Sequence, residues 1–180
     1  EKITRPKSGD GSPSGWLSRL LLGVAACGVL FNLYLIWDVW QEKAPGKFVT
    51  GKETRDQYLA RNVPRYPMYQ AMNRLNPESR VLLVYMRNLG YLAERSFHSD
   101  SVFEAHTLQT LLAQDASMEG IRRQLKSLGV THLMFDRNYV FGKESAFFPE
   151  HQNALERFLN DRAQLLEERN NFFLYRLVLD

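Results

Sequence analysis

The sequence predicts an α/β protein in which one N-terminal transmembrane helix precedes a three-layer domain. The sheet of this domain is expected to be mostly parallel and to end in an antiparallel hairpin. Three observations predict this fold class. A long run without charged side chains lies near the N-terminus. Two short apolar runs typical of buried strands flank segments of helical pattern. An Asn-Asn dipeptide divides the last two apolar segments, which is typical of a tight hairpin.

Residues 15–40 form the predicted transmembrane helix. The stretch from Leu20 to Trp37 carries no charge. At about 1.5 Å of rise per residue it covers roughly 27 Å, close to the hydrocarbon thickness of a bilayer. Trp16 and Trp40 lie at its two ends, where indole rings prefer the membrane interface. The alternatives are a buried core helix and a cleaved signal peptide, but the run is too apolar on all sides for the first and too long for the second.

The rest of the chain divides by composition. Residues 1–14 are polar and rich in Pro, Gly and Ser, so we expect a disordered linker. Because the chain does not start with Met, we expect it to continue a longer membrane protein. Residues 41–78 are predicted to be a juxtamembrane connector with two helices, broken by Pro64 and Pro67. Residues 79–180 are predicted to be the soluble α/β domain.

The sheet is predicted from the two apolar runs at residues 80–86 and 130–135. Ser101 and Glu104 have the spacing of a capping box, so a first helix is expected from residue 101 to about 113. A second helix is expected over residues 117–128, ended by Gly129. Strand, helices and strand in this order form a crossover unit, which predicts that the two strands are parallel.

The C-terminal third is predicted to complete the sheet. A loop is expected over residues 139–148, and a helix is expected to begin at Pro149. Asn170 and Asn171 are expected to form the turn of the hairpin. The last strand has two largely apolar faces, so it should lie inside the sheet or under helices.

Polar side chains follow both predicted parallel strands. The carboxyl ends of parallel strands meet at one sheet edge, where open α/β sheets bind ligands. We therefore predict a ligand-facing edge that could hold a phosphate or sugar hydroxyls. The alternative is that the acidic and basic residues here cap loops and pair locally. The predicted ligand-facing residues are Arg87, Asn88, Tyr91, Asp136 and Arg137.

Other sites are not supported by residue spacing. His98, Asp100, Glu104 and His106 are metal-ligand types, but their spacing does not bring them to one point, so no metal site is expected. His132 alternates with apolar residues and is expected to be a core histidine. No nucleotide-binding or nucleophile motif occurs, so neither a cofactor nor a catalytic residue is predicted. The net charge is only +3 and mixed along the chain, which argues against nucleic acid as a partner.

Several phrases follow the apolar run in a fixed order: FVTGKETRDQYLARNVPRYPMYQAMNRLNPESRVLLV, RNLGYL, SDSVF, LKSLGVTHLMFDRNY and NNFFLYRL. In this order the chain resembles the last span and the extracytoplasmic C-terminal domain of bacterial integral-membrane glycosyltransferases of the GT-C superfamily. That superfamily includes protein mannosyltransferases and lipid A sugar transferases. The resemblance covers nearly all of the chain after Gly15, although it contains no catalytic fingerprint.

The resemblance implies a function for the whole enzyme. It would use a polyprenyl-phosphate sugar as donor, and this domain would lie on the periplasmic side of the bacterial cytoplasmic membrane. The family's catalytic aspartate lies in a more N-terminal loop, so the chain would be an accessory part, with the bilayer and the remainder of the parent protein as partners. The alternative is a single-span membrane subunit or assembly factor whose α/β domain binds a protein partner.

Overall fold

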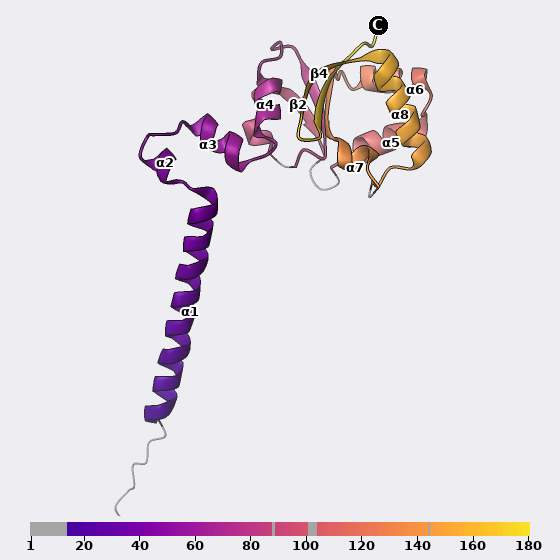
Figure 1. Cartoon of the computed structure of the whole chain (residues 1–180). Coiled ribbons are helices and arrows are strands. Elements are labelled where there is room, and N and C mark those ends of the chain that lie inside the picture. The colour runs from indigo at the N-terminus through magenta and orange to yellow at the C-terminus, as the bar shows by residue number, and fades with distance from the viewer. Residues whose placement is uncertain (1–13, 88, 101–103, 144) are drawn as a thin grey trace, which may run out of the picture. The chain divides into compact units, whose positions relative to one another are not determined.

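The computed structural model describes residues 14–87, 89–100, 104–143 and 145–180 (Figure 1). The linker predicted for residues 1–14 falls almost entirely outside these residues. The chain divides into two compact units, Glu1–Tyr58 and Leu59–Asp180.

The first unit contains the apolar helix α1, Ser14–Lys43. Its segment Trp16–Lys43 is long and apolar enough to cross a membrane, and none of its most apolar stretch is buried against protein. A short helix α2, Gly46–Val49, follows. Helix α3, Arg55–Asn62, starts with reciprocal hydrogen bonds in which Thr54 N–H donates to Gln57 Oε1 and Gln57 N–H donates to Thr54 Oγ1. This is the capping-box arrangement, which satisfies two amides of the first turn.

The second unit contains a five-stranded mixed sheet in the order β2-β1-β3-β5-β4. Two of its four strand pairings, β1 with β2 and β1 with β3, are parallel, and the other two are antiparallel. The predicted fold class is confirmed, including the parallel crossover pair and the C-terminal antiparallel hairpin. The strands are β1 (Arg80–Val84), β2 (Ser96–Ser99), β3 (His132–Asp136), β4 (Ala163–Arg169) and β5 (Phe172–Leu177).

Helices cover both faces of the sheet, as Figure 1 shows. Helix α4 (Tyr66–Asn73) packs on one face and buries Tyr69 and Met72 against Leu83 and Met134. The opposite face holds the larger core under three helices. These three helices are α5 (His106–Gln114), α6 (Met118–Ser127) and α8 (Pro149–Arg162). We call the two faces the α4 face and the α8 face.

Local sequence signals explain several boundaries. Gly129 has φ +66° and ends α6, because a left-handed residue after a helix is least costly at glycine. Asn170 and Asn171 have φ +51° and +65° between paired residues Arg169 and Phe172. Two successive positive φ values are those of a type I′ hairpin turn. The structure thus confirms the predicted turn, and β5 lies inside the sheet as expected.

Two predicted boundaries are wrong. Helix α5 begins at His106 rather than near residue 101, and the proposed cap Ser101 lies outside the described residues. Glu104 instead contacts the loop after β1, as described below, so it does not serve an N-terminal helical turn. Residues 139–141, predicted as loop, belong to the short helix α7, Arg137–Phe141, which is capped by Asp136.

Candidate functional site

The candidate site lies where β1 and β3 end side by side. Val84 of β1 is paired with Phe135 of β3, so the two strands deliver their next residues to the same edge. The connection from β1 to β2 passes over the α4 face, where Leu92 is buried, whereas α7 and α8, which follow β3, pack on the α8 face. A crevice forms where neighbouring strands lead to opposite faces, and open α/β sheets bind ligands at such points.

Asp136 is almost completely buried at this edge. Its Oδ1 accepts a hydrogen bond from Asn138 N–H at 3.1 Å, which caps α7, and its Oδ2 accepts one from Arg65 Nη2 at 3.3 Å. Burial raises the pKa of Asp136 and outweighs the opposing effects of the Asn138 amide and of Arg65 and Arg87. Asp136 therefore acts as a helix cap. This local role is the alternative to ligand binding that the sequence left open. Asp136 also pairs with Arg65.

Arg65 reaches the edge from the N-cap position of α4. Its guanidinium lies 4.8 Å from the centre of the Phe172 ring, in cation–π geometry, while one Nη pairs with Asp136. Its Nε is buried and has no hydrogen-bond partner among the described residues. A buried donor without an acceptor costs about 1–3 kcal/mol. The Arg65 Nε–H can therefore still donate to an oxygen of water or of a ligand that enters this part of the edge.

The backbone after β1 is held in an unusual conformation. Tyr85 and Arg87 have φ +55° and +61°, values that side chains with a Cβ rarely adopt. Glu104 stabilises both residues, because its carbonyl accepts Tyr85 N–H at 3.1 Å and its Oε2 accepts Arg87 N–H at 3.2 Å. The Tyr69 hydroxyl donates to the Met86 carbonyl at 3.3 Å, and burial raises the pKa of Tyr69.

The structure separates the predicted ligand-facing residues. Arg87 is exposed on the loop after β1 and contributes electrostatically to Asp136. Tyr91 is 76% exposed. Arg137 belongs to the α8 face, because its guanidinium lies 5.5 Å from the centre of the Phe173 ring. Asn88 lies outside the described residues. Arg87 and Asp136 therefore share an environment that Arg137 does not, and their ligand-facing role stays a prediction.

Three residues of the site were not foreseen. Arg65 lies 71 residues before Asp136, and no local pattern links them. Glu104 was interpreted as part of a capping box, and Tyr69 as a packing residue of α4. The only sequence signal for Arg65 is its place between Pro64 and Pro67, which restrict the chain as it enters α4.

The histidines have other roles. His98 Nε2 lies 3.1 Å from Thr107 Oγ1, and Asp100 accepts hydrogen bonds from the amide and hydroxyl of the same threonine at 2.8 and 2.7 Å. Within the described ranges, no three His, Cys, Asp or Glu side chains are grouped to hold a metal ion. His132 is buried, and its Nδ1 lies 2.8 Å from Thr131 Oγ1, which confirms the predicted core histidine. Burial and Arg176 lower its pKa.

The available chemistry at the edge is hydrogen-bond donation. Each oxygen of Asp136 accepts one hydrogen bond and the side chain is almost completely buried, so little of the carboxylate is open to an acceptor hydroxyl. Among the described residues of the edge, the exposed donors without a side-chain partner are the guanidinium of Arg87 and the hydroxyl of Tyr91, and Arg65 Nε is a buried donor without one. Such donors fit hydroxyl or phosphate oxygens.

Comparison with known proteins gives a likeness of fold. No protein-family model matches the chain, and no curated protein matches it. A solved structure with a similar fold is the C-terminal globular domain of an oligosaccharyltransferase from Archaeoglobus fulgidus. The identity is 12% and the TM-score 0.44, and the match covers 69% of this chain and 97% of that chain. This likeness concerns the arrangement of helices and strands only.

Proposed function

We propose that this chain is the C-terminal accessory part of a membrane glycosyltransferase of the GT-C superfamily. The enzyme would transfer a sugar from a polyprenyl-phosphate donor to an acceptor outside the bacterial cytoplasmic membrane. The observation that carries the proposal is the order of elements: a helix able to span a membrane, a connector with the family-like phrase GKETRDQYL, and an α/β domain with the phrase GVTHLMFD. The catalytic aspartate would lie on another part of the enzyme.

In this function the carboxyl edge contributes binding and not chemistry. Asp136 is held by Arg65 and by the α7 amide, so it orients the Arg65 guanidinium rather than accepting a proton from an acceptor. Arg87 and Tyr91 are the exposed groups of the edge. Their donors would contact oxygens of the donor phosphate or of the acceptor.

The proposal is tested on the parent enzyme in membranes, with transfer from a polyprenyl-phosphate sugar as the assay. Arg87→Gln removes an exposed guanidinium at the edge, and Arg123→Gln is the matched control on the exposed side of α6. We expect the first variant to raise KM while kcat changes little, because a binding contact is lost and no proton transfer is affected. If both variants show equal kinetics, the edge does not contribute to transfer. If the enzyme keeps full transfer after deletion of everything beyond Trp40, the domain is not needed for transfer.

A second candidate function is binding of a protein partner by a single-span membrane subunit. It is favoured by the edge strand β4, which pairs only with β5 and exposes Leu165 and Leu166 at 43% and 38%. A free strand edge with apolar side chains can accept a strand of another chain. Leu165→Lys should then release a partner that copurifies with the full chain, whereas Arg87→Gln should not. Further apolar spans upstream of Glu1 in the parent gene would argue for the enzyme instead.

A further inference from the structure

The turn that follows α1 borders an open surface pocket of about 420 Å³ in the first unit, which we call the cavity. Trp40, Lys47, Thr50 and Lys52 are among the residues that line it. We propose that this cavity binds the phosphate group of an anionic phospholipid of the bilayer. The inference goes beyond the proposed function and does not depend on it.

Backbone hydrogen bonds bring the two lysines to one place. Helix α1 ends at Lys43, and the next residue, Ala44, has φ +41° while its N–H still donates to the Trp40 carbonyl at 2.9 Å. The Lys47 carbonyl then accepts both Lys52 N–H at 2.8 Å and Glu53 N–H at 3.1 Å. Gly51, with φ +72°, allows this close return of the chain. The turn is therefore closed and places Lys47 and Lys52 at the same cavity.

The cavity lacks its own counter-charge. Lys47 and Lys52 are both exposed, and neither forms an ion pair in the part of the chain that the structure describes. Two ammonium groups at one site repel each other, and an anion between them removes the repulsion. The Thr50 hydroxyl donates to the Gly46 carbonyl at 2.8 Å, which leaves its oxygen as an acceptor and the lysines as the donors for a phosphate.

The position of Trp40 relates the cavity to the membrane interface. From Trp16 to Trp40 the helix rises about 36 Å, which exceeds the roughly 30 Å of hydrocarbon and lets both indoles reach the headgroup layers. Phe48 and Val49 are 41% and 72% exposed within the same turn, so they can enter the interface beside the lysines. A cavity that contains Trp40 therefore lies at the depth of lipid phosphates.

The fluorescence of Trp40 can report lipid binding at the cavity. The full chain carrying Trp16→Phe and Trp37→Phe keeps Trp40 as its only tryptophan. Reconstituted in phosphatidylcholine bilayers, its fluorescence is quenched by brominated lipids that bind next to it. The ratio of quenching by brominated phosphatidylglycerol to quenching by brominated phosphatidylcholine gives the relative affinity for the anionic headgroup. We expect clear preference for phosphatidylglycerol.

Variants separate the cavity from general surface charge. Lys47→Gln and Lys52→Gln should each reduce the preference about fivefold, the factor that corresponds to about 1 kcal/mol per lysine near an anionic surface. Arg55→Gln is the matched control, because Arg55 is an exposed cation of the same unit that does not line the cavity. An equal loss in the control, or no preference in the parent chain, would overturn the proposal. Inorganic phosphate should reduce the preference more than chloride of the same ionic strength, because free phosphate competes for the same two lysines. Equal reduction by both salts would indicate general charge screening and would also overturn the proposal.

Discussion

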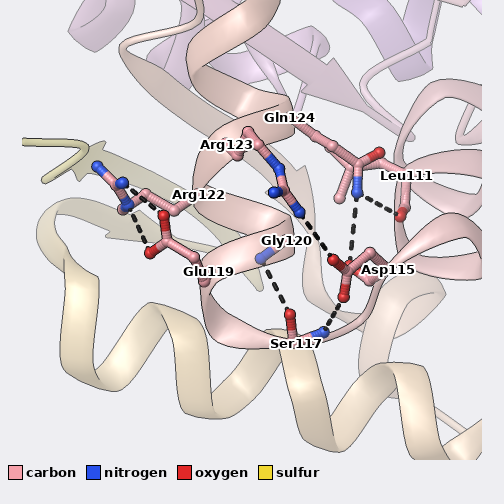
Figure 2. A network of polar contacts seen from close by, with 8 residues as sticks. All are labelled: Leu111, Asp115, Ser117, Glu119, Gly120, Arg122, Arg123 and Gln124. Carbon is pink, nitrogen blue, oxygen red and sulfur yellow. Dashed lines mark hydrogen bonds and ion pairs between the residues drawn. The ribbon is translucent and has the colours of Figure 1, made fainter.

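Two polar clusters of the second unit show how differently charges are used on this domain. Figure 2 shows the corner between α5 and α6, where Arg123 pairs with Asp115 at 3.0 Å and Arg122 pairs with Glu119. Ser117 caps α6 through Gly120 N–H, and Gln124 donates to the Leu111 carbonyl. The carboxyl edge instead contains one buried carboxylate, a buried unpaired Nε and two non-glycine residues with positive φ.

The pKa directions of the two clusters are opposite. Hydrogen bonds from Ser117 lower the pKa of Asp115, and the hydrogen bond from Arg122 lowers that of Glu119. Burial raises the pKa of Asp136 in spite of Arg65. The charged side chains of the corner are therefore balanced by residues close in sequence and by solvent. The edge instead keeps a buried carboxylate and a buried donor without an acceptor, which costs folding free energy. Costly polar arrangements that persist are concentrated at functional sites, which is the physical reason for proposing the edge, and not the corner, as the binding region.

The largest expected difference comes from removing the acid of each cluster. Asp136→Ala deletes the cap of α7 and leaves the Arg65 guanidinium without its carboxylate, so it should cost about 3 kcal/mol. Asp115→Ala should cost several times less, because its partners are exposed to water. Urea unfolding of the full chain in detergent micelles, followed by far-UV circular dichroism, measures both. If the two variants lose similar free energies of unfolding, the two clusters do not differ in the way proposed.

Two glycines offer a second comparison. A Cβ at Gly142 would overlap the Asn138 carbonyl in the backbone of α7, so Gly142→Ala should cost about 1–3 kcal/mol. The three atoms nearest to a Cβ at Gly120 belong to the Asp115 carboxylate, a side chain that can rotate away at the cost of its hydrogen bonds with Ser117 and Arg123. The higher helix propensity of alanine, worth about 1 kcal/mol relative to glycine, should offset the free energy lost when the Asp115 side chain moves. The melting temperature of Gly120→Ala should thus be close to that of the parent chain, and the melting temperature of Gly142→Ala should be clearly lower.

The contributions of Asp136 and Asp115 to the free energy of unfolding should depend on pH with opposite signs. A raised folded pKa means that Asp136 stabilises the fold below its ordinary pKa of 3.8 and loses this contribution as the pH rises through the folded value. Asparagine can still cap α7, so Asp136→Asn should gain stability relative to the parent as pH rises from 3.8. Asp115→Asn should lose stability relative to the parent as pH rises from the lowered folded pKa of Asp115 to 3.8, because the stabilising contribution of Asp115 is fully present only above 3.8. Unfolding free energies at a series of acidic pH values test both signs.

The smallest expected effect is at the exposed end of the corner. Glu119→Gln removes one acceptor from Arg122, but Arg122 Nη1 also donates to the Leu179 carbonyl at 2.9 Å and stays in place. The change in unfolding free energy should fall within the error of a urea titration. A large loss would mean that the corner is as cooperative as the edge.

Errors in the sequence-based predictions fall near the carboxyl edge. Strands β1 and β3, the helix ended by Gly129 and the C-terminal hairpin with its Asn-Asn turn were predicted, because each follows from residues that are close in sequence. Glu104 was placed in a helix start because its spacing from Ser101 fits a cap, yet it contacts Tyr85 and Arg87 across the chain. A tertiary hydrogen bond replaced the local one that the pattern suggested.

The amino-acid sequence by itself determined the apolar helix, the alternation of strands and helices and the tight turns, since hydrophobic periodicity and backbone preference act over a few residues. Only the tertiary structure decided that Arg65 meets Asp136 over Phe172, that Arg137 turns to the other face, and that Lys47 and Lys52 share a cavity. These contacts depend on the path and packing of the backbone, which no local residue pattern specifies.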